Sequence, residues 1–173
     1  MTRAQLEHLI RAAATIADDD EIIVIGSQAV LGQFPQAPPT LLVSIGADLY
    51  PRHHPERAEL IDGSIGELSP FHETFGYYAQ GVGEDTAKLP AGWQERLVPV
   101  PAGGARGLCL EVHDLALSKW AAGREKDREF VEEAVRHGLV ERAILLERLP
   151  TMPVDEGHRE ILRGRIEAAF SAR

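Results

Sequence analysis

A short apolar run that stops at a Gly-Ser pair limits the fold of this chain more than any other feature. Residues 21–25 (EIIVI) are mostly β-branched and too few for a helix, which predicts a buried strand. Gly26 follows directly and, without a Cβ, lets a ligand approach the backbone. Ser27 is of the type that caps helices, so we expect a helix over residues 28–34. Free amides at a helix start attract anions, although an ordinary strand–turn–helix fits the same residues.

A second extended run carries a single carboxylate near this turn. Residues 41–50 are expected to form the next strand, after a proline-rich connection. Residues two apart share one face of a strand, so Ser44, Gly46 and Asp48 would form a polar side. The residues that alternate with them are apolar and would line the other side: Val43, Ile45, Ala47 and Leu49. A strand carboxylate beside a Gly-Ser turn suits a nucleoside triphosphate with a magnesium ion.

The one dense basic group of the chain lies between residues 114 and 130. Asp114 is expected to cap a helix that contains Lys119, and a second helix follows. Three cations begin that second helix: Arg124, Lys126 and Arg128. Lys119 would neutralise the phosphates of a nucleotide or protonate the leaving pyrophosphate, and Asp127 would orient it or an arginine. The alternative is a solvated helix face with local ion pairs.

The composition is that of a globular protein with a core of its own. The 173 residues are 44% hydrophobic and 26% charged, which favours one domain, with a core over residues 1–113 and a helical part over residues 114–173. The net charge of −9 disfavours passive binding of nucleic acid, so such a partner would need a local basic patch. No run approaches the roughly 18 apolar residues of a membrane span, and the first residues lack a signal-peptide core. With Cys109 as the only cysteine, we expect no internal disulfide and a soluble cytoplasmic protein without a membrane partner.

The remaining periodicities predict an α+β fold, with a small mixed β-sheet flanked by helices and a helical C-terminal part. Helical spacing is present over residues 4–17, 55–61, 124–136, 140–149 and 155–172. Extended runs lie over residues 76–82, 95–100 and 108–112.

Several polar or aromatic clusters are better explained by structure than by a site. The three aspartates of residues 18–20 diverge, so we expect a solvated loop there. His53 and His54 point apart in an extended segment, which disfavours shared metal ligation. We interpret Tyr77 and Tyr78 as core residues, with base stacking as the alternative.

Together the Gly-Ser turn, the strand carboxylate and the late basic segment resemble the polymerase-beta-type nucleotidyltransferases. The Gly26-Ser27 pair corresponds to the GS motif of that family, and Asp48 to the second acid of its acid-x-acid strand. Lys119 and residues 124–127 (REKD) match its late K…RxKD signature. The closer likeness, over about residues 22–135, is to the small bacterial branch that contains AbiEii- and MenT-type toxins.

The resemblance implies a mixed sheet flanked by helices and a reaction. Members of the family use an NTP with Mg²⁺, or with Mn²⁺, and transfer a nucleotidyl group to a hydroxyl with release of pyrophosphate. In the toxin branch the acceptor is often the 3′ end of tRNA, a protein acceptor being the alternative, and an antitoxin can silence the enzyme. The implied catalytic residues are Asp48, Lys119 and Ser27, with Asp48 also the metal ligand. The implied nucleotide-binding residues are Gly26, Ser27, Lys119, Arg124 and Asp127.

One position departs from the family pattern. The acid-x-acid strand normally presents two carboxylates on one face, but the first position here is Gly46. Asp48 would hold one magnesium ion with triphosphate oxygens and waters, and a second ion would need another carboxylate. Four acids are open candidates: Asp62, Glu67, Glu73 and Glu111. We expect an active nucleotidyltransferase; the alternatives are a catalytically reduced module that binds nucleotide or regulates a partner, and a scaffold without a nucleotide site.

Overall fold

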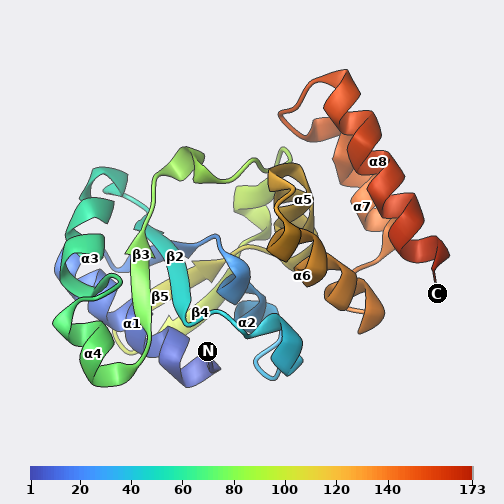
Figure 1. Ribbon diagram of the computed structural model, residues 1–173. Helices are drawn as coiled ribbons and strands as arrows, with labels where there is room; N and C mark the ends of the chain where they lie inside the picture. Colours follow the sequence, from blue (N-terminus) through green and yellow to red (C-terminus); the bar gives the residue numbers. More distant parts are fainter. Residues whose placement is uncertain (173) are drawn as a thin grey trace.

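The computed structural model describes residues 1–172, which contain a five-stranded mixed sheet (Figure 1). The strands are β1 (Glu21–Val24), β2 (Gly46–Pro51), β3 (Tyr78–Gly81), β4 (Val98–Ala102) and β5 (Ala105–Cys109). Their order across the sheet is β3-β2-β1-β5-β4. β1 is parallel to β5 and β2 to β3, whereas β1 and β2, and β4 and β5, are antiparallel. The expected α+β fold is therefore confirmed.

Helices precede, separate and follow these strands. The α-helices before β4 are α1 (Arg3–Ala17), α2 (Val30–Gln33), α3 (Ala58–Ile65) and α4 (Pro70–Phe75). The C-terminal ones are α5 (Val112–Ala122), α6 (Glu125–Arg136), α7 (Arg142–Arg148) and α8 (Glu156–Ser171). Short 3-10 helices are η1 (Ser27–Ala29), η2 (Pro39–Leu41), η3 (Pro55–Arg57), η4 (Glu84–Thr86), η5 (Trp93–Arg96) and η6 (Leu149–Thr151).

Close contacts at two glycines show which face of the sheet the first helices cover. A Cβ on Gly107 of β5 would lie 2.4 Å from Cδ1 of Ile10 in α1. A Cβ on Gly32 of α2 would lie 2.6 Å from the Cβ of Cys109, two residues further along β5. Residues two apart share a face, so α1 and α2 cover the same side of the sheet.

Asp48 points to the other face. Leu49 of β2 lies opposite Val24 of β1, and Val24 lies opposite Cys109 on the covered face. Side chains alternate along a strand, so Asp48, the neighbour of Leu49, projects away from α1 and α2. The carboxylate singled out in the sequence therefore lies where the sheet is open to a ligand.

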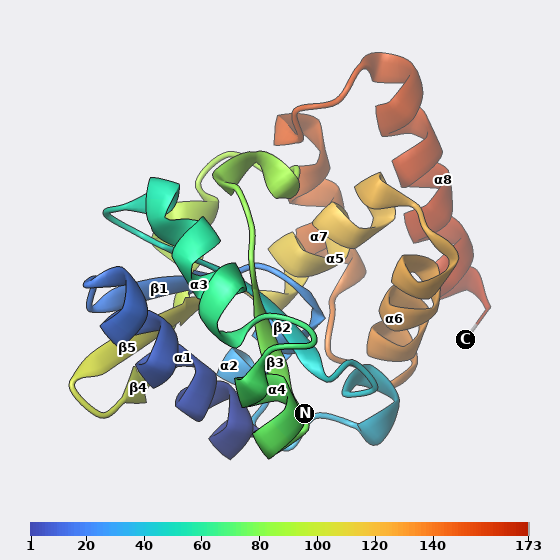
Figure 2. The ribbon, with the colours of Figure 1, turned by 60° about the vertical axis from the view of Figure 1, so that its left-hand side comes forward.

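The C-terminal helices form a second group beside the sheet (Figures 1 and 2). α5 contacts each of α6, α7 and α8, and α6 also contacts η2 in the loop that leads into β2. α6 is thus placed to face the open side of β2. Within residues 1–172 no helix is both long and apolar enough to cross a lipid bilayer.

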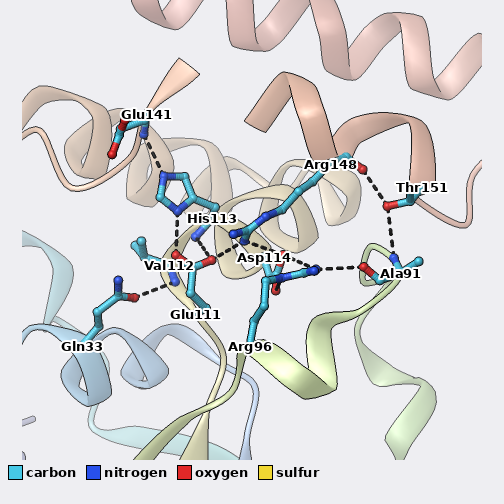
Figure 3. Close-up of polar contacts among 10 residues, drawn as sticks. All are labelled: Gln33, Ala91, Arg96, Glu111, Val112, His113, Asp114, Glu141, Arg148 and Thr151. Carbon is cyan, nitrogen blue, oxygen red and sulfur yellow. Dashed lines mark hydrogen bonds and ion pairs between the residues drawn. The ribbon is translucent and has the colours of Figure 1, made fainter. Parts of the chain in front are cut away.

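A buried polar network attaches these helices to the rest of the chain (Figure 3). Asp114 of α5 is fully buried. Arg96 of η5 donates to both of its carboxylate oxygens, at 2.8 and 3.0 Å, and Arg148 of α7 donates to Oδ1 at 3.0 Å. One buried carboxylate therefore joins three segments that are distant in the sequence.

Two predicted helix caps are wrong. Gly26, not Ser27, holds the N-cap position after β1, and the helix there consists of η1, with three residues, and α2, with four. Glu111, not Asp114, caps α5, because its side chain accepts a hydrogen bond from the His113 amide at 3.1 Å. Both caps were predicted from residue type alone, but each helix begins at an earlier residue than predicted. So short a helix also lacks the strong positive end expected beside Ser27.

The strand expected over residues 41–50 begins only at Gly46. Ser44 Oγ donates to the carbonyl of Gly46 at 2.9 Å and accepts from its amide at 3.2 Å, which closes a turn just before the strand. Val43 and Ile45, expected on the apolar side of this strand, precede it and are 78% and 48% exposed. Residues in this turn do not alternate between two faces as strand residues do, so the predicted pattern holds only from Gly46 onward.

Candidate functional site

A cavity of about 810 Å³ lies on the open face of the sheet. Ser27, Asp48 and Lys119 all line it, with residues of β2 and β3 on one wall and α6 on another. A second hollow of about 350 Å³ shares Asp48 and Lys119 with the first and is also lined by Gly26 and Asp127. The structure therefore brings the predicted site residues together, although they lie far apart in the sequence.

Gly26 lies directly against the side chain of Asp48. A Cβ on Gly26 would lie 2.4 Å from Oδ2 of Asp48, and the amide of Ile25 donates to the Asp48 carbonyl at 3.0 Å. The space that the missing Cβ leaves is thus taken by the carboxylate. Burial raises the pKa of Asp48, while nearby cations, Lys119 foremost, act in the opposite direction. The acid is held close to charges that also attract phosphate.

Lys119, Asp127 and Arg124 form an ion-pair cluster at the edge of the cavity. Lys119 Nζ donates to Oδ1 of Asp127 at 3.1 Å, and Arg124 Nε donates to Oδ2 at 2.7 Å. Lys119 is 8% exposed and Asp127 is fully buried, so the alternative of a solvated helix face is wrong for both. Asp127 thus accepts hydrogen bonds from both cations. Arg128 lines a different hollow, between α5, α6 and α8.

The environment of this cluster lowers the pKa values of Lys119 and Asp127. Burial lowers the pKa of Lys119 and outweighs the attraction of Asp127. Burial would raise the pKa of Asp127, but the hydrogen bond from Arg124 and the charge of Lys119 hold it below its ordinary value. Nζ of Lys119 also lies 4.9 Å from the centroid of the Phe130 ring, a cation–π distance. The cation is thus held by two partners, Asp127 and the Phe130 ring, before any ligand binds.

The sequence over most of the chain matches a known family. Residues 4–160 match the family described as a nucleotidyltransferase of unknown function (DUF6036). The chain belongs to this nucleotidyltransferase family. Comparison with curated proteins and with solved structures found no match. The resemblance to nucleotidyltransferases is thereby confirmed, and the likeness to the AbiEii and MenT toxin branch stays a prediction.

An aromatic ring from β3 covers position 46 of β2, where the first acid of the family pattern is missing. A Cβ on Gly46 would lie 2.6 Å from both Cε2 and Cζ of Tyr78. The two residues are partners on the parallel strands β2 and β3, and Tyr78 lines the cavity. An acidic side chain at position 46 would have to displace this ring.

The acids left open as further metal ligands lie outside both hollows, as far as residues 1–172 show: Asp62, Glu67, Glu73 and Glu111. Burial would raise the pKa of Glu111, but its contacts with His113 and Arg148 lower it to about 2. Its role is in the network of Figure 3. Three other acids, all of α6, do line the cavity: Glu129, Glu132 and Glu133.

Gln80 is a site residue that sequence reasoning missed. It pairs with Asp48 in the register of β2 and β3 and lines the same cavity. A glutamine on a short strand gives no signal of its own, so only the strand pairing reveals it. Asp48, Gln80 and Ser27 offer a carboxylate, an amide oxygen and a hydroxyl, which are the ligands that magnesium prefers. As residues that line one cavity, they would share an ion with waters and triphosphate oxygens.

A separate acidic group lies at the opposite end of β1. One ligand atom each of Asp19, Asp20 and His53 come within 4.8 Å of one another. Asp19 is buried, so a solvated loop is the wrong description of it. Its Oδ2 accepts from the amides of His53 and His54 at 2.7 and 3.2 Å, and Oδ1 accepts from the amide of Glu21 at 3.1 Å. These bonds occupy the carboxylate, and we assign Asp19 to the fold.

Proposed function

We propose that this protein transfers a nucleotidyl group from a magnesium-bound nucleoside triphosphate to a hydroxyl acceptor. One observation carries the proposal: Asp48 from the sheet and the Lys119–Asp127 pair from the helices border the same hollow of about 350 Å³, and Asp48 and Lys119 also line the larger cavity. A triphosphate and its metal ion together need cations and a carboxylate side by side. Membership of the nucleotidyltransferase family supports the same reaction.

The residues of the chain would divide the work by charge. Asp48, with Gln80 beside it, would hold the ion, which when bound neutralises charge on the phosphates. Ser27 would donate to a phosphate oxygen. Lys119, whose pKa is lowered by burial, would give a proton to the leaving pyrophosphate more readily than a solvated lysine. The acceptor oxygen bonds to the α-phosphorus, the bond to pyrophosphate breaks, and the hydroxyl proton passes to water.

The 3′ end of tRNA is the acceptor we propose first, and a protein hydroxyl the second. The resemblance to the toxin branch supports this order. So do Arg124 and Lys126, exposed cations that line the cavity and would meet an RNA end before it reached Lys119. In this role the protein would be the toxin of a toxin–antitoxin pair, with a cognate antitoxin as its partner.

Transfer of label from nucleotides tests the proposed reaction. The protein is incubated with each α-³²P-labelled NTP, Mg²⁺ or Mn²⁺, and either total tRNA or no added acceptor. We expect label in the tRNA or in the protein. In Lys119→Ala, which removes the cation at the phosphates, the rate of transfer should fall by roughly 100-fold or more. Arg128→Ala is the control, because Arg128 belongs to the same segment but lines a different hollow. Failure of transfer to both acceptors with both metals would overturn the proposal.

The Tyr78 ring, which lies against Gly46, supports a second candidate function. In this candidate the protein is a reduced nucleotidyltransferase fold that binds nucleotide without turnover. For such a module we expect Mg-NTP to raise the melting temperature while no label is transferred. Gly46→Glu restores the missing acid, but Tyr78 must move to admit it. Transfer seen in this variant and not in the wild type would favour the module, and robust wild-type transfer rejects it.

A further inference from the structure

Tyr78 lines the cavity from the sheet side but has no part in the roles assigned above. Among residues 1–172, the other Phe, Tyr or Trp ring on the lining is that of Phe130, which is 7% exposed and lies beneath Lys119. The Tyr78 ring is only half-buried. We propose that Tyr78 is the platform on which the base of the bound nucleotide stacks, an inference that rests on the proposed function.

Contacts on two sides hold the Tyr78 ring in position. Beneath it, the ring atoms lie so close to the backbone of Gly46 that a Cβ there would come within 2.6 Å of them. Beside it, the ring of His72 lies 4.8 Å away between centroids, at an angle of 52°. Glycine at position 46 is what permits this approach. The stacking surface is therefore formed in advance, and a base would lose little free energy in ordering it.

The position of Tyr78 relative to Asp48 suits a single nucleotide. Tyr78 pairs with Gly46 and Gln80 pairs with Asp48, so the ring and the carboxylate are two residues apart along the sheet. That spacing is about 6.6 Å in parallel strands. With its triphosphate beside Asp48 and Lys119, a nucleotide would place its sugar along β2 and its base over the Tyr78 ring.

Tyr77, the neighbouring tyrosine, shows the contrast. Its hydroxyl lies 2.6 Å from Nδ1 of His8, and its ring packs among His8, Phe71 and Phe75. Successive residues point to opposite sides of an extended segment. Tyr77 therefore packs, partly buried, against the core, whereas Tyr78 presents its ring to the cavity.

The ligand class follows from the chemistry of the ring. Stacking on an aromatic side chain tolerates every base, because each base has a π face. Burial raises the pKa of Tyr78, and the negative charges of Glu67 and Asp48 raise it further, so the hydroxyl stays protonated at neutral pH and brings no charge to the triphosphate. We expect all four nucleotides to bind, with the larger purines bound more tightly than the pyrimidines.

Binding of a nucleotide and of its phosphate part separates the platform from the phosphate site. Dissociation constants for a non-hydrolysable ATP analogue and for inorganic tripolyphosphate are measured with Mg²⁺ by calorimetry. In Tyr78→Leu we expect binding of the analogue to weaken roughly five- to 100-fold and binding of tripolyphosphate to stay unchanged. Tyr78→Phe keeps the ring and should retain wild-type values. Phe75→Leu, which alters an exposed ring of α4, is the control.

A second variant guards against a folding defect in Tyr78→Leu. Gly46→Ala leaves Tyr78 in the chain but pushes its ring aside, so the same selective loss of the analogue is expected. Equal analogue binding by Tyr78→Leu and the wild type would overturn the platform while leaving the phosphate site intact. A loss of tripolyphosphate binding as large as the loss of analogue binding would also overturn it, because the ring would then support the phosphate site and not the base. A wild-type protein that binds neither ligand would overturn the proposed function and the platform with it.

Discussion

Gln28 is the residue whose presence the fold explains least. It is fully buried in η1, directly after Ser27, and neither atom of its amide has a hydrogen-bond partner within residues 1–172. An unpaired buried polar group costs about 1–3 kcal/mol. Folded proteins retain few such groups, and departures of this kind gather at functional sites. Gln28 directly follows Ser27, which lines the cavity, and this position fits that pattern.

We predict that Gln28→Met stabilises the protein. Methionine has a similar volume and no amide, so the free energy of unfolding should rise by about 1–3 kcal/mol, measured by urea denaturation. Gln33→Met is the matched control in the next helix. Gln33 Oε1 accepts from the amide of Val112 at 3.0 Å, so its replacement should destabilise the protein. Equal losses of stability in the two variants would contradict the prediction.

At the scale of elements, local patterns predicted helices better than they predicted pairing. The helix expected over residues 4–17 is present as α1 (Arg3–Ala17). It could be predicted because the spacing of its apolar residues indicates a helix with one buried side. The register of β2 with β3 has no such local signal. That register places Tyr78 on Gly46 and Gln80 beside Asp48, and these are the parts of the site that the sequence did not reveal.

The start of α5 shows how one element fixes another. Glu111 caps this helix and also accepts from Nδ1 of His113, at 2.6 Å, and from Arg148 of α7. Nε2 of His113 in turn accepts from the amide of Glu141 at 2.9 Å, just before α7. The carboxylate therefore holds the two helices together through its negative charge (Figure 3).

Acid should weaken this junction first. The pKa of Glu111 is lowered from 4.5 to about 2, so its contribution to stability is complete above pH 4.5 and is lost as the pH falls toward 2. Between pH 5 and pH 2 the free energy of unfolding should fall by about 3 kcal/mol more in the wild type than in Glu111→Gln. Urea denaturation at each pH measures this, with the exposed Glu147→Gln as control. Parallel pH curves for wild type and Glu111→Gln would contradict the assignment.

At the scale of the molecule, the cavity is shared between two parts of the chain. Residues of β2 and β3 line one part of it, and residues of α6, one of the C-terminal helices, line another. Asp48 stands on the first part, and the Lys119–Asp127 pair on the second. These two parts are distant in the sequence, so the motifs could indicate candidate residues but not the shape of the cavity that the residues line.

A ligand that touches both walls should therefore stabilise both parts together. We predict that Mg-ATP analogue at 100 times its dissociation constant raises the free energy of unfolding by about 2.7 kcal/mol and raises the melting temperature accordingly. Amide hydrogen exchange should slow in β2 and β3 and also in α5 and α6, because bridging suppresses local opening on either side. In Lys119→Ala the slowing in α5 and α6 should be lost while that in β2 and β3 remains, since the variant lacks the lysine that contacts the phosphates from the helices. Slower exchange confined to the sheet would show that the nucleotide binds Asp48 without reaching the helices.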